Sequence, residues 1–244
     1  MAAVFLETLN WPEAEKVLRG DAPIVVPLGA ALKEHGRHLP LNNDKLLAGR
    51  LVDELAKRLD IVVSPVVETS YYPAFIEYPG SISLAFETAS ALIFETCAGL
   101  AGFGCRRIYV LNTGVSTSRV LQRVRDSLLL QFPHLKFAYT DFKHAVESAS
   151  CGIAQQKGGG HADEVETSMM LYLAPQVVKM EMAECDFHGA SGGPLTRDVQ
   201  RVGVSDAVYS PSGAWGDPTL ASLQKGELIV NKLLDWLEKD IRSL

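Results

Sequence analysis

Apolar runs and segments of helical period alternate along most of this chain. The first apolar run covers 22–29, and we expect it to form a buried strand. Leucines at every third or fourth position along 43–59 predict an amphipathic helix soon after it. The alternation continues with predicted strands at 61–67, 107–111 and 135–140, and with predicted helices at 81–100, from about 117 to 132, and at 223–244. It predicts an α/β fold of three layers, α/β/α, with a largely parallel, doubly wound sheet.

The pattern is weaker between 145 and 182. Segment 145–160 is rich in glycine and poorly periodic, which is typical of a surface loop or partial lid. A helix over 166–173 and a short strand over 177–182 complete the predicted elements. Because no internal repeat or low-complexity tract divides the chain, we expect residues 1–244 to form a single domain.

The composition excludes several classes of protein. The 244 residues are 47% hydrophobic and 21% charged, which is enough for a sizeable core. The net charge is -6 and no Lys/Arg cluster is dense enough to follow phosphates, so we expect no nucleic-acid partner. Glu87 and Glu95 interrupt the apolar run 81–100, so we expect no membrane span. The four cysteines form no CxxC pair and no secretory signal is evident, which favours reduced thiols and a cytoplasmic location.

Candidate chemistry follows the first predicted strand. The turn within 27–44 packs two histidines, two carboxylates and one lysine together: His35, His38, Glu34, Asp44 and Lys33. Polar side chains at the carboxyl end of a buried strand are typical of the active sites of α/β enzymes.

Five separated blocks of the sequence resemble the creatininase (creatinine amidohydrolase) family. The blocks are 27–29, 35–41 with Asp44, 78–84, 160–168 and 216–221. Their order agrees with the family and they span most of the chain. The resemblance implies a metal-dependent hydrolase with two divalent ions, zinc or manganese, at the carboxyl ends of the strands. In such a site a bridging water attacks a carbonyl that a metal polarises. The resemblance also implies a small-molecule substrate and a homo-oligomer, often a hexamer.

The ligand positions of the family are only partly kept. His35 matches a metal-binding histidine, Asp44 the bridging aspartate, His161 the proton carrier, and Glu166 the acidic residue of a Glu-Thr-Ser block. Two positions depart from the family pattern, because Lys33 stands where a glutamate is usual and Gly114 where a histidine is usual. The resemblance assigns both missing ligands to the same metal.

These departures lead to a hypothesis of one ion instead of two. On an extended backbone, residues two apart face the same side, so Lys33 and His35 share a face while Glu34 points away. Lys33 then supplies positive charge at the first metal position, and His35, Asp44 and Glu166 hold the remaining ion. The alternative is a bulge at the extra residue of this loop, which rotates Glu34 back into the ligand position.

The remaining candidates each have a functional and a structural interpretation. His161 follows three glycines and is predicted to carry a proton, the alternative being a polar contact within its loop. Glu68, Tyr71 and Tyr72 are predicted to line the substrate pocket and Trp215 to close over the substrate, the alternative for the aromatic residues being ordinary packing. Asn112, Gly114 and Ser116 lie in a loop before a predicted helix, where free backbone N–H groups suit an anionic part of the substrate.

The other histidines have simpler interpretations. We expect His38 to hold its turn through a hydrogen bond, the alternative being a metal ligand. We expect His134, His144 and His188 to be surface or core residues, the alternative for His144 being replacement of a missing metal ligand. Taken together, the sequence predicts a hydrolase that uses metal-activated water to cleave a C–N bond in a small cyclic amide or formamide-like substrate. The alternative function is that of a homologue that has lost catalysis and binds a small ligand or serves in an assembly.

Overall fold

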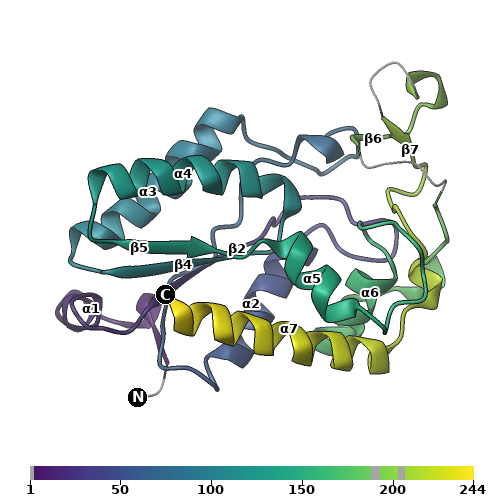
Figure 1. Cartoon of the computed structure of the whole chain (residues 1–244). Coiled ribbons are helices and arrows are strands. Elements are labelled where there is room, and N and C mark those ends of the chain that lie inside the picture. The colour runs from purple at the N-terminus through teal and green to yellow at the C-terminus, as the bar shows by residue number, and fades with distance from the viewer. Residues whose placement is uncertain (1–2, 188–192, 203–206) are drawn as a thin grey trace.

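A parallel sheet of five strands forms the centre of the fold (Figure 1). The computed structural model describes residues 3–187, 193–202 and 207–244, so His188 lies outside the described residues. The strand order is β1-β3-β2-β4-β5, and each neighbouring pair is parallel. The strands are β1 Val4–Phe5, β2 Ile24–Leu28, β3 Val62–Val63, β4 Arg107–Asn112 and β5 Lys136–Tyr139. The predicted α/β class with a largely parallel sheet is confirmed.

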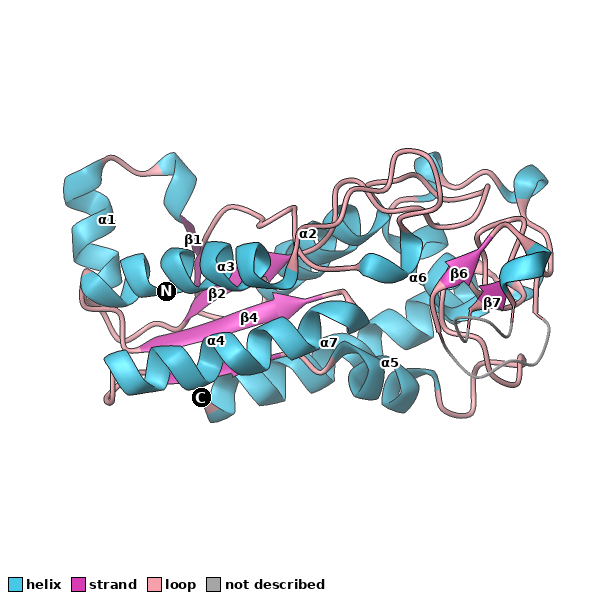
Figure 2. Cartoon of the chain, turned by 90° about the horizontal axis from the view of Figure 1, so that it is seen from above, coloured by secondary structure: helices cyan, strands magenta, loops and turns pink. Residues whose placement is uncertain are grey.

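Helices cover both faces of this sheet (Figures 1 and 2). On one face lie α3 and α4, and the end of α1 packs into the same core; their bounds are α1 Trp11–Leu18, α3 Phe86–Gly102 and α4 Ser118–Gln131. On the other face lie α2 Asn43–Leu55, α5 Phe142–Ser150, α6 Glu164–Leu173 and α7 Leu223–Ser243. Side chains of β2 alternate between the two cores, since Val25 belongs to one cluster and Ile24 and Val26 to the other.

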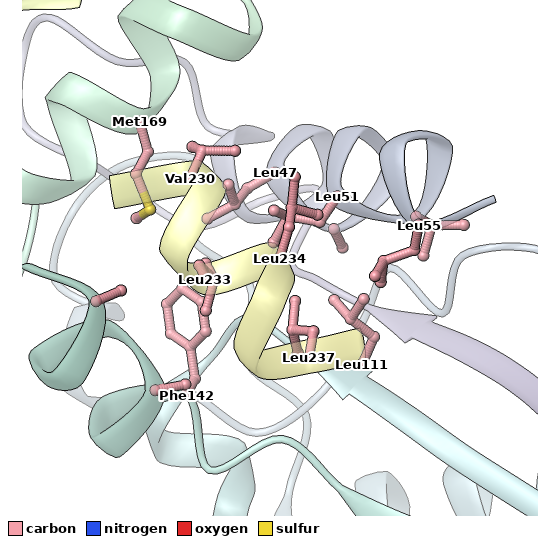
Figure 3. Packing of buried hydrophobic residues seen from close by; sticks show 14 of the residues in the cluster. Leu47, Leu51, Leu55, Leu111, Phe142, Met169, Val230, Leu233, Leu234 and Leu237 are labelled. Carbon is pink, nitrogen blue, oxygen red and sulfur yellow. The ribbon is translucent and has the colours of Figure 1, made fainter. Parts of the chain in front are cut away.

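The larger core lies between α2, α7 and the sheet, as Figure 3 shows. Leu47, Leu51 and Leu55 recur at the helical period along α2 and are completely buried. They pack against the face of α7 that carries Val230 and Leu234. Burying one leucine side chain contributes roughly 1.5–3 kcal/mol, so this interface holds α2, and the site residue at its first turn, in place.

Two predicted elements are shorter than expected. The strand predicted over 61–67 is regular only at Val62–Val63, because Pro65 lacks the N–H that the ladder requires. The helix predicted over 81–100 begins at Phe86. The backbone before it pairs with two loops instead, since the N–H of Ile82 donates to Leu32 and that of Leu84 donates to Ser70.

Two other predictions within 142–182 are wrong. The predicted loop over 145–160 contains most of helix α5, which Asp141 caps by accepting a hydrogen bond from the backbone N–H of His144. Phe142, Ala145 and Ala149 lie on one face of α5 and are buried in the core. The glycines at 152 and 158–160 lie in the same window of the sequence and made this helical period hard to recognise. The predicted strand over 177–182 is replaced by two short 3-10 helices, Pro175–Val177 and Met180–Met182, the first of which begins at a proline.

Helix α1 and strand β1 were not predicted. Asn10 and Glu13 form a capping box at the start of α1, in which each side chain accepts a hydrogen bond from the backbone of the other. This Asn-x-x-Glu spacing was a readable signal. A second small sheet pairs β6 Leu195–Thr196 with β7 Val208–Tyr209 at the end of the molecule beyond the central strands (Figure 2).

The topology places a crevice at the carboxyl ends of β2 and β4. The chain passes from β2 to β3 on one side and then crosses to β4 on the other, so connections leave the two adjacent strands in opposite directions. Ligands of open α/β sheets bind at such switch points. Among the described residues, no helix combines the length and apolar character needed to cross a membrane.

Candidate functional site

The site forms where the loop after β2 meets the first turn of α2. Gly29 directly follows β2, and a Cβ atom there would collide with the backbone carbonyl of Asp44. Thr113, directly after β4, donates from Oγ1 to the same carbonyl at 3.0 Å. These contacts bring the two strand ends and α2 together and fix the position of the Asp44 side chain.

The Asp44 carboxylate joins Lys33 and His35. Its Oδ2 lies 2.6 Å from Lys33 Nζ and its Oδ1 lies 2.8 Å from His35 Nε2. His35 Nδ1 donates to the backbone carbonyl of Lys33 at 2.8 Å, so this nitrogen carries a proton and Nε2 faces the carboxylate. All three side chains are buried, with relative exposures of 6% for Lys33, 0% for His35 and 2% for Asp44.

The charges of this cluster shift its protonation equilibria. Burial alone raises the pKa of Asp44, but the nearby Lys33 and His35 outweigh it and hold that pKa well below its usual range. Burial lowers the pKa of Lys33, yet the negative charges of Asp44 and Glu166 outweigh burial and the net pKa is raised. Lys33 therefore remains an ammonium and Asp44 a carboxylate throughout the physiological range.

Glu34 turns away from Asp44 and contacts His161. His161 Nε2 lies 2.8 Å from Glu34 Oε1 and 3.0 Å from the Glu34 backbone carbonyl. Both oxygens accept, so Nε2 carries the proton and Nδ1 is left unprotonated in the neutral ring. The second carboxylate oxygen of Glu34 accepts from the backbone N–H of Gly36 at 2.9 Å. Glu34 thus orients His161 and does not contact Asp44.

Glu166 lies in the first turn of α6 and faces both histidines. Its Oε1 is 3.5 Å from His35 Nε2 and accepts from Asn43 Nδ2 at 2.9 Å. Its Oε2 is 4.0 Å from His161 Nδ1 and accepts from the backbone N–H of Ala162 at 2.8 Å. Ala162 has a φ of 48°, a left-handed conformation in which its N–H points at this carboxylate.

Two neighbouring groups stabilise α6 and the loop after β2 that carries Lys33, Glu34 and His35. Asp163 caps α6 through the backbone N–H groups of Val165 and Glu166, and burial raises its pKa to about 6. His38 lies 2.8 Å from Thr167 through Nε2 and Oγ1, and burial lowers its pKa to about 4. His38 therefore holds the turn through a hydrogen bond, as the sequence predicts.

A cavity of about 880 Å³ opens onto these residues. The predicted site residues that line it are Lys33, Asp44, Asn112, Gly114, Ser116, His161, Glu166 and Trp215. Glu68 and Tyr71 do not line it: Glu68 pairs with Lys45, and Tyr71 packs edge-on against Phe86 with ring centroids 5.6 Å apart. Tyr72 lines the cavity, as the sequence predicts.

The donor atoms fit one divalent ion. One nitrogen from each of His35 and His161 and one oxygen from Glu166 lie within 4.8 Å of one another, and Asp44 adjoins this group through His35. Imidazole and carboxylate groups are the usual ligands of zinc and manganese. The place beside Asp44 Oδ2 already contains the Lys33 ammonium, and Gly114 offers no side chain there. The residues present therefore fit one ion better than two.

Several residues of the site were not predicted from the sequence. Phe75 lies under the cluster, with Lys33 Nζ 4.8 Å from its ring centroid and the His161 ring centroid at 4.3 Å. Asn43 and Ser70 also belong to the site or its cavity. The only sequence signal for 70–75 is its place between two family blocks, directly before 78–84.

The fold is a parallel α/β fold, and the histidine and carboxylate side chains at its switch point could hold a metal ion, as in many α/β enzymes. Comparison with known proteins identifies the family. The creatininase family model, described as creatinine amidohydrolase, matches residues 7–241. The chain belongs to the creatininase family, whose named enzymes are hydrolases.

Curated relatives act on chemically different substrates according to their names. Creatinine amidohydrolase of Pseudomonas putida is 26% identical over 263 residues, covering 99% of this chain and 97% of the relative. The 3-dehydro-scyllo-inosose hydrolase of Thermotoga maritima is 26% identical, covering 99% and 83%. The mycofactocin precursor peptide peptidase of Mycobacterium ulcerans is 27% identical, covering 87% and 81%.

Solved creatininase structures share the fold over the whole chain. A mutant creatininase of the Zn–Zn type superposes with a TM-score of 0.84 at 25% identity, covering 100% of this chain and 98% of that one. A mutant creatininase complexed with creatine gives a TM-score of 0.82 at 25% identity, covering 99% and 98%. The family and its hydrolase class are thereby established, as the five sequence blocks predict.

Proposed function

We propose that this chain is a metal-dependent amidohydrolase that cleaves a C–N bond in a small cyclic amide or formamide-like substrate and holds one zinc or manganese ion per chain. The contact that carries the proposal is the ion pair of Lys33 with Asp44, at 2.6 Å. It fills one side of the aspartate that family resemblance assigns as a bridge between two metals. The other side of Asp44 faces His35 and remains suited to a ligand role.

The charge balance of the site supports a single ion. Three carboxylates, Asp44, Glu34 and Glu166, surround the one ammonium of Lys33. With both histidines neutral, as metal coordination requires of a histidine ligand, these four groups carry two net negative charges, and one divalent ion balances them. A second ion beside Asp44 would meet the Lys33 ammonium, which repels it.

Named residues have distinct roles in this proposal. His35, Asp44 and Glu166 hold the ion, which when bound lowers the pKa of water enough to supply hydroxide near neutral pH. His161 accepts the proton at Nδ1 and returns it to the leaving nitrogen, while Glu34 keeps its Nε2 protonated and its ring oriented. Lys33 keeps Asp44 ionised and presents positive charge to the cavity.

The cavity supports a small-molecule substrate. Its volume of about 880 Å³ falls in the range typical of small-molecule sites. Trp215 offers an apolar wall. The loop of Asn112, Gly114 and Ser116 also lines the cavity, but the Gly114 N–H donates to Asn112 Oδ1 at 3.1 Å, so this N–H is not free for an anion as the sequence predicted. The names of the relatives indicate that each hydrolyses its substrate and that the substrates differ in shape. We therefore limit the proposal to the type of bond that is cleaved.

Replacement of Asp44 tests the proposal. We expect Asp44→Ala to lose bound metal and to abolish hydrolysis of a panel of cyclic amides and formamides, because the ligand and the partner of Lys33 are removed together. Glu68→Gln is the matched control, since Glu68 forms only a half-exposed ion pair with Lys45. If Asp44→Ala leaves both metal content and hydrolysis unchanged, the enzymatic proposal fails and a ligand-binding or assembly role replaces it.

We also infer a cytoplasmic homo-oligomer. All four cysteines are free of disulfides, which agrees with a reducing compartment. Trp11, Phe103 and Leu130 are 78%, 65% and 85% exposed, and we infer that another subunit covers them in the oligomer. Light scattering on the purified chain measures the assembly, and a monomer at micromolar concentration would contradict it.

A further inference from the structure

The side chain of Gln156 uses its whole hydrogen-bonding capacity. Its Oε1 accepts from the backbone N–H of Asp217 at 2.9 Å and from that of Glu164 at 3.2 Å. Its Nε2 donates to the Gly158 carbonyl at 2.8 Å and to Asp163 Oδ2 at 2.6 Å. A glutamine amide has two lone pairs and two N–H groups, so these four contacts satisfy it. Gln156 lines the cavity, yet its amide has no hydrogen bond left to offer a substrate.

The amide of Gln156 packs against the turn that presents His161. Residues 158–160 are glycines, and all three have positive φ, at 87°, 89° and 136°. The turn passes very close to the amide, because a Cβ atom at Gly159 would lie 2.8 Å from Gln156 Nε2. The same Cβ atom would lie 2.8 Å from the backbone carbonyl of Trp215. The chain can therefore follow this path only with glycine, and the amide fixes the path from one side.

Trp215 holds the backbone of His161 from the other side. The N–H of Trp215 donates to the His161 carbonyl at 2.8 Å, and the N–H of Gly160 donates to the Trp215 carbonyl at 3.0 Å. Gln156 in turn holds the chain just beyond Trp215 through the N–H of Asp217. The segment before His161, the segment paired with it and the start of α6 after it are thus bonded to one amide.

A buried charge supports the segment that carries Gln156. Glu164 is 0% exposed, and its carboxylate accepts from the backbone N–H groups of Gln155 and Gln156 at 2.9 and 2.7 Å. It also pairs at 2.5 Å with Nζ of Lys225, in the first turn of α7. Breaking a buried ion pair is strongly destabilising, so the backbone of Gln156 is firmly held and its amide acts from a fixed position.

The ring of His161 is anchored at one nitrogen only. Its Nε2 contacts Glu34 Oε1 at 2.8 Å, whereas Nδ1, the atom to which the proposed function assigns the proton, lies 4.0 Å from Glu166 Oε2. The place of Nδ1 therefore depends on where the backbone puts the residue. A displacement of about 1 Å in a catalytic group lowers the rate on the order of 100-fold, so a fixed backbone is valuable here.

We propose that Gln156 is a positioning residue for the proton carrier: its amide joins the glycine turn, the start of α6 and the chain after Trp215 into one unit that fixes His161 Nδ1. The inference rests on the proposed function and deepens it. Gln156 acts through the backbone of His161 and binds neither the substrate nor the metal, because all four of its hydrogen bonds are made within the protein.

Gln156→Met keeps the length of the side chain and removes all four contacts. We expect kcat on the best substrate of a panel of cyclic amides and formamides to fall about 100-fold. KM and bound metal should stay near the parent values, because Asp163 Oδ1 still caps α6 and the substrate loses no contact. The measurements are steady-state kinetics and elemental analysis.

Gln156→Glu is the second variant, for use if Gln156→Met fails to fold. It keeps the size of the side chain and the two contacts in which Oε1 accepts, and it replaces both donors by an oxygen. This oxygen faces the Gly158 carbonyl and the Asp163 carboxylate, which repel it. We expect the same fall in kcat, and a kcat equal to that of the parent would contradict the inference.

Gln155→Met is the matched control, since it makes the same substitution at the neighbouring position. Gln155 is exposed, and among the described residues its side chain has no hydrogen bond, while its backbone N–H donates to Glu164. We expect kcat, KM and bound metal to equal those of the parent. Equal losses of kcat in Gln155→Met and Gln156→Met would overturn the inference.

A double-mutant cycle with His161→Gln separates a positioning role from a purely structural one. If Gln156 acts through His161, Gln156→Met lowers kcat in the parent but causes no further fall in the His161→Gln background. A similar fall in both backgrounds would show that the amide supports the fold or another group, and it would overturn the inference. A Gln156→Met variant that loses its metal would overturn it as well.

Two outcomes separate the inference from the proposed function. If the parent chain hydrolyses the panel and Gln156→Met does so equally well, only the positioning role fails. If the parent hydrolyses no member, both proposals fail. A crystal structure of Gln156→Met gives a direct view: we expect the His161 ring to be displaced from its place in the parent, and an unmoved ring contradicts the inference.

Discussion

Lys33 and Asp44 form a buried ion pair, with Nζ of one 2.6 Å from Oδ2 of the other, at the end of the central strand. The loop after β2 carries the lysine and the first turn of α2 carries the aspartate. The remaining oxygen of Asp44 meets His35, so one carboxylate connects a fixed positive charge to a candidate metal ligand. The ion pair with Lys33 therefore stabilises the loop after β2 and, in the proposed site, takes up the side of Asp44 that a second ion would need.

Lys33→Met tests the contribution of this pair to stability. Removal of the ammonium leaves a buried carboxylate without its strongest partner, so we expect the free energy of unfolding to fall by about 3–5 kcal/mol in the presence of a chelator. Excess manganese should recover part of this loss, because a cation can replace the ammonium beside Asp44. Urea unfolding with and without manganese measures both effects.

Lys45→Met provides the control for this measurement. Lys45 and Glu68 are 41% and 48% exposed, and exposed ion pairs contribute about 0–1 kcal/mol. We expect its unfolding free energy to be nearly that of the parent under both conditions. Equal losses in the two variants would show that burial of the Lys33 pair has no special role.

His161→Gln tests the assignment of the proton carrier. We expect kcat to fall roughly 100- to 10,000-fold while bound metal stays at the parent level, since general acid–base catalysis contributes that much. His144→Gln is the control, because His144 is exposed on α5. Loss of metal in His161→Gln would instead make His161 a ligand, which its place in the group with His35 and Glu166 also permits.

His38 predicts a pH dependence of stability. Its folded pKa is lowered to about 4 from an ordinary value of 6.5, so the unfolded chain binds this proton more readily than the folded chain. The stabilisation is therefore complete above pH 6.5 and is lost as pH falls from 6.5 toward 4, by roughly 3 kcal/mol in total.

The measurement compares the parent with His38→Gln by urea unfolding between pH 8 and pH 4. Since glutamine does not titrate, the difference between the two curves isolates His38 from other groups such as Asp163. We expect the advantage of the parent to shrink across this window. A difference that is constant with pH would show that His38 has an ordinary pKa in the folded chain.

Elements with a continuous apolar pattern were predictable from the sequence. The strands that begin at Ile24 and Arg107 and the terminal helix that begins at Leu223 have long, regular patterns, and the structure places each close to its predicted range. Val4–Phe5 is too short to give a pattern, and its pairing with Val62–Val63 depends on a contact far along the chain. Pro65 is a local signal that the strand is interrupted, although it lies within an apolar run. The capping box at Asn10 is a local signal for the start of a helix, although the residues after it show no clear period.

The site was predictable only where the backbone dictates side-chain direction. Alternation along an extended loop predicts Lys33 and His35 on one side and Glu34 on the other, and the structure has Lys33 and His35 on Asp44 and Glu34 on His161. The partner of Glu34 lies 127 positions away, so no local pattern identifies it. The place of Phe75 beneath Lys33 and His161 was equally hidden, because it depends on contacts that form only in the folded chain.

Metal content per chain is the most direct test of the central claim. Elemental analysis of the purified parent, equilibrated with zinc or manganese and freed of excess ion, should give one tightly bound ion per chain. The double variant Lys33→Glu with Gly114→His restores the ligand types that the family usually carries, and the nearest neighbours of a Cβ atom at Gly114 are the side chains of Thr117 and Asn112, at 3.3 Å or more. We expect two ions in this variant. Two tightly bound ions in the parent, or none, would contradict the account of a site in which Lys33 replaces one metal.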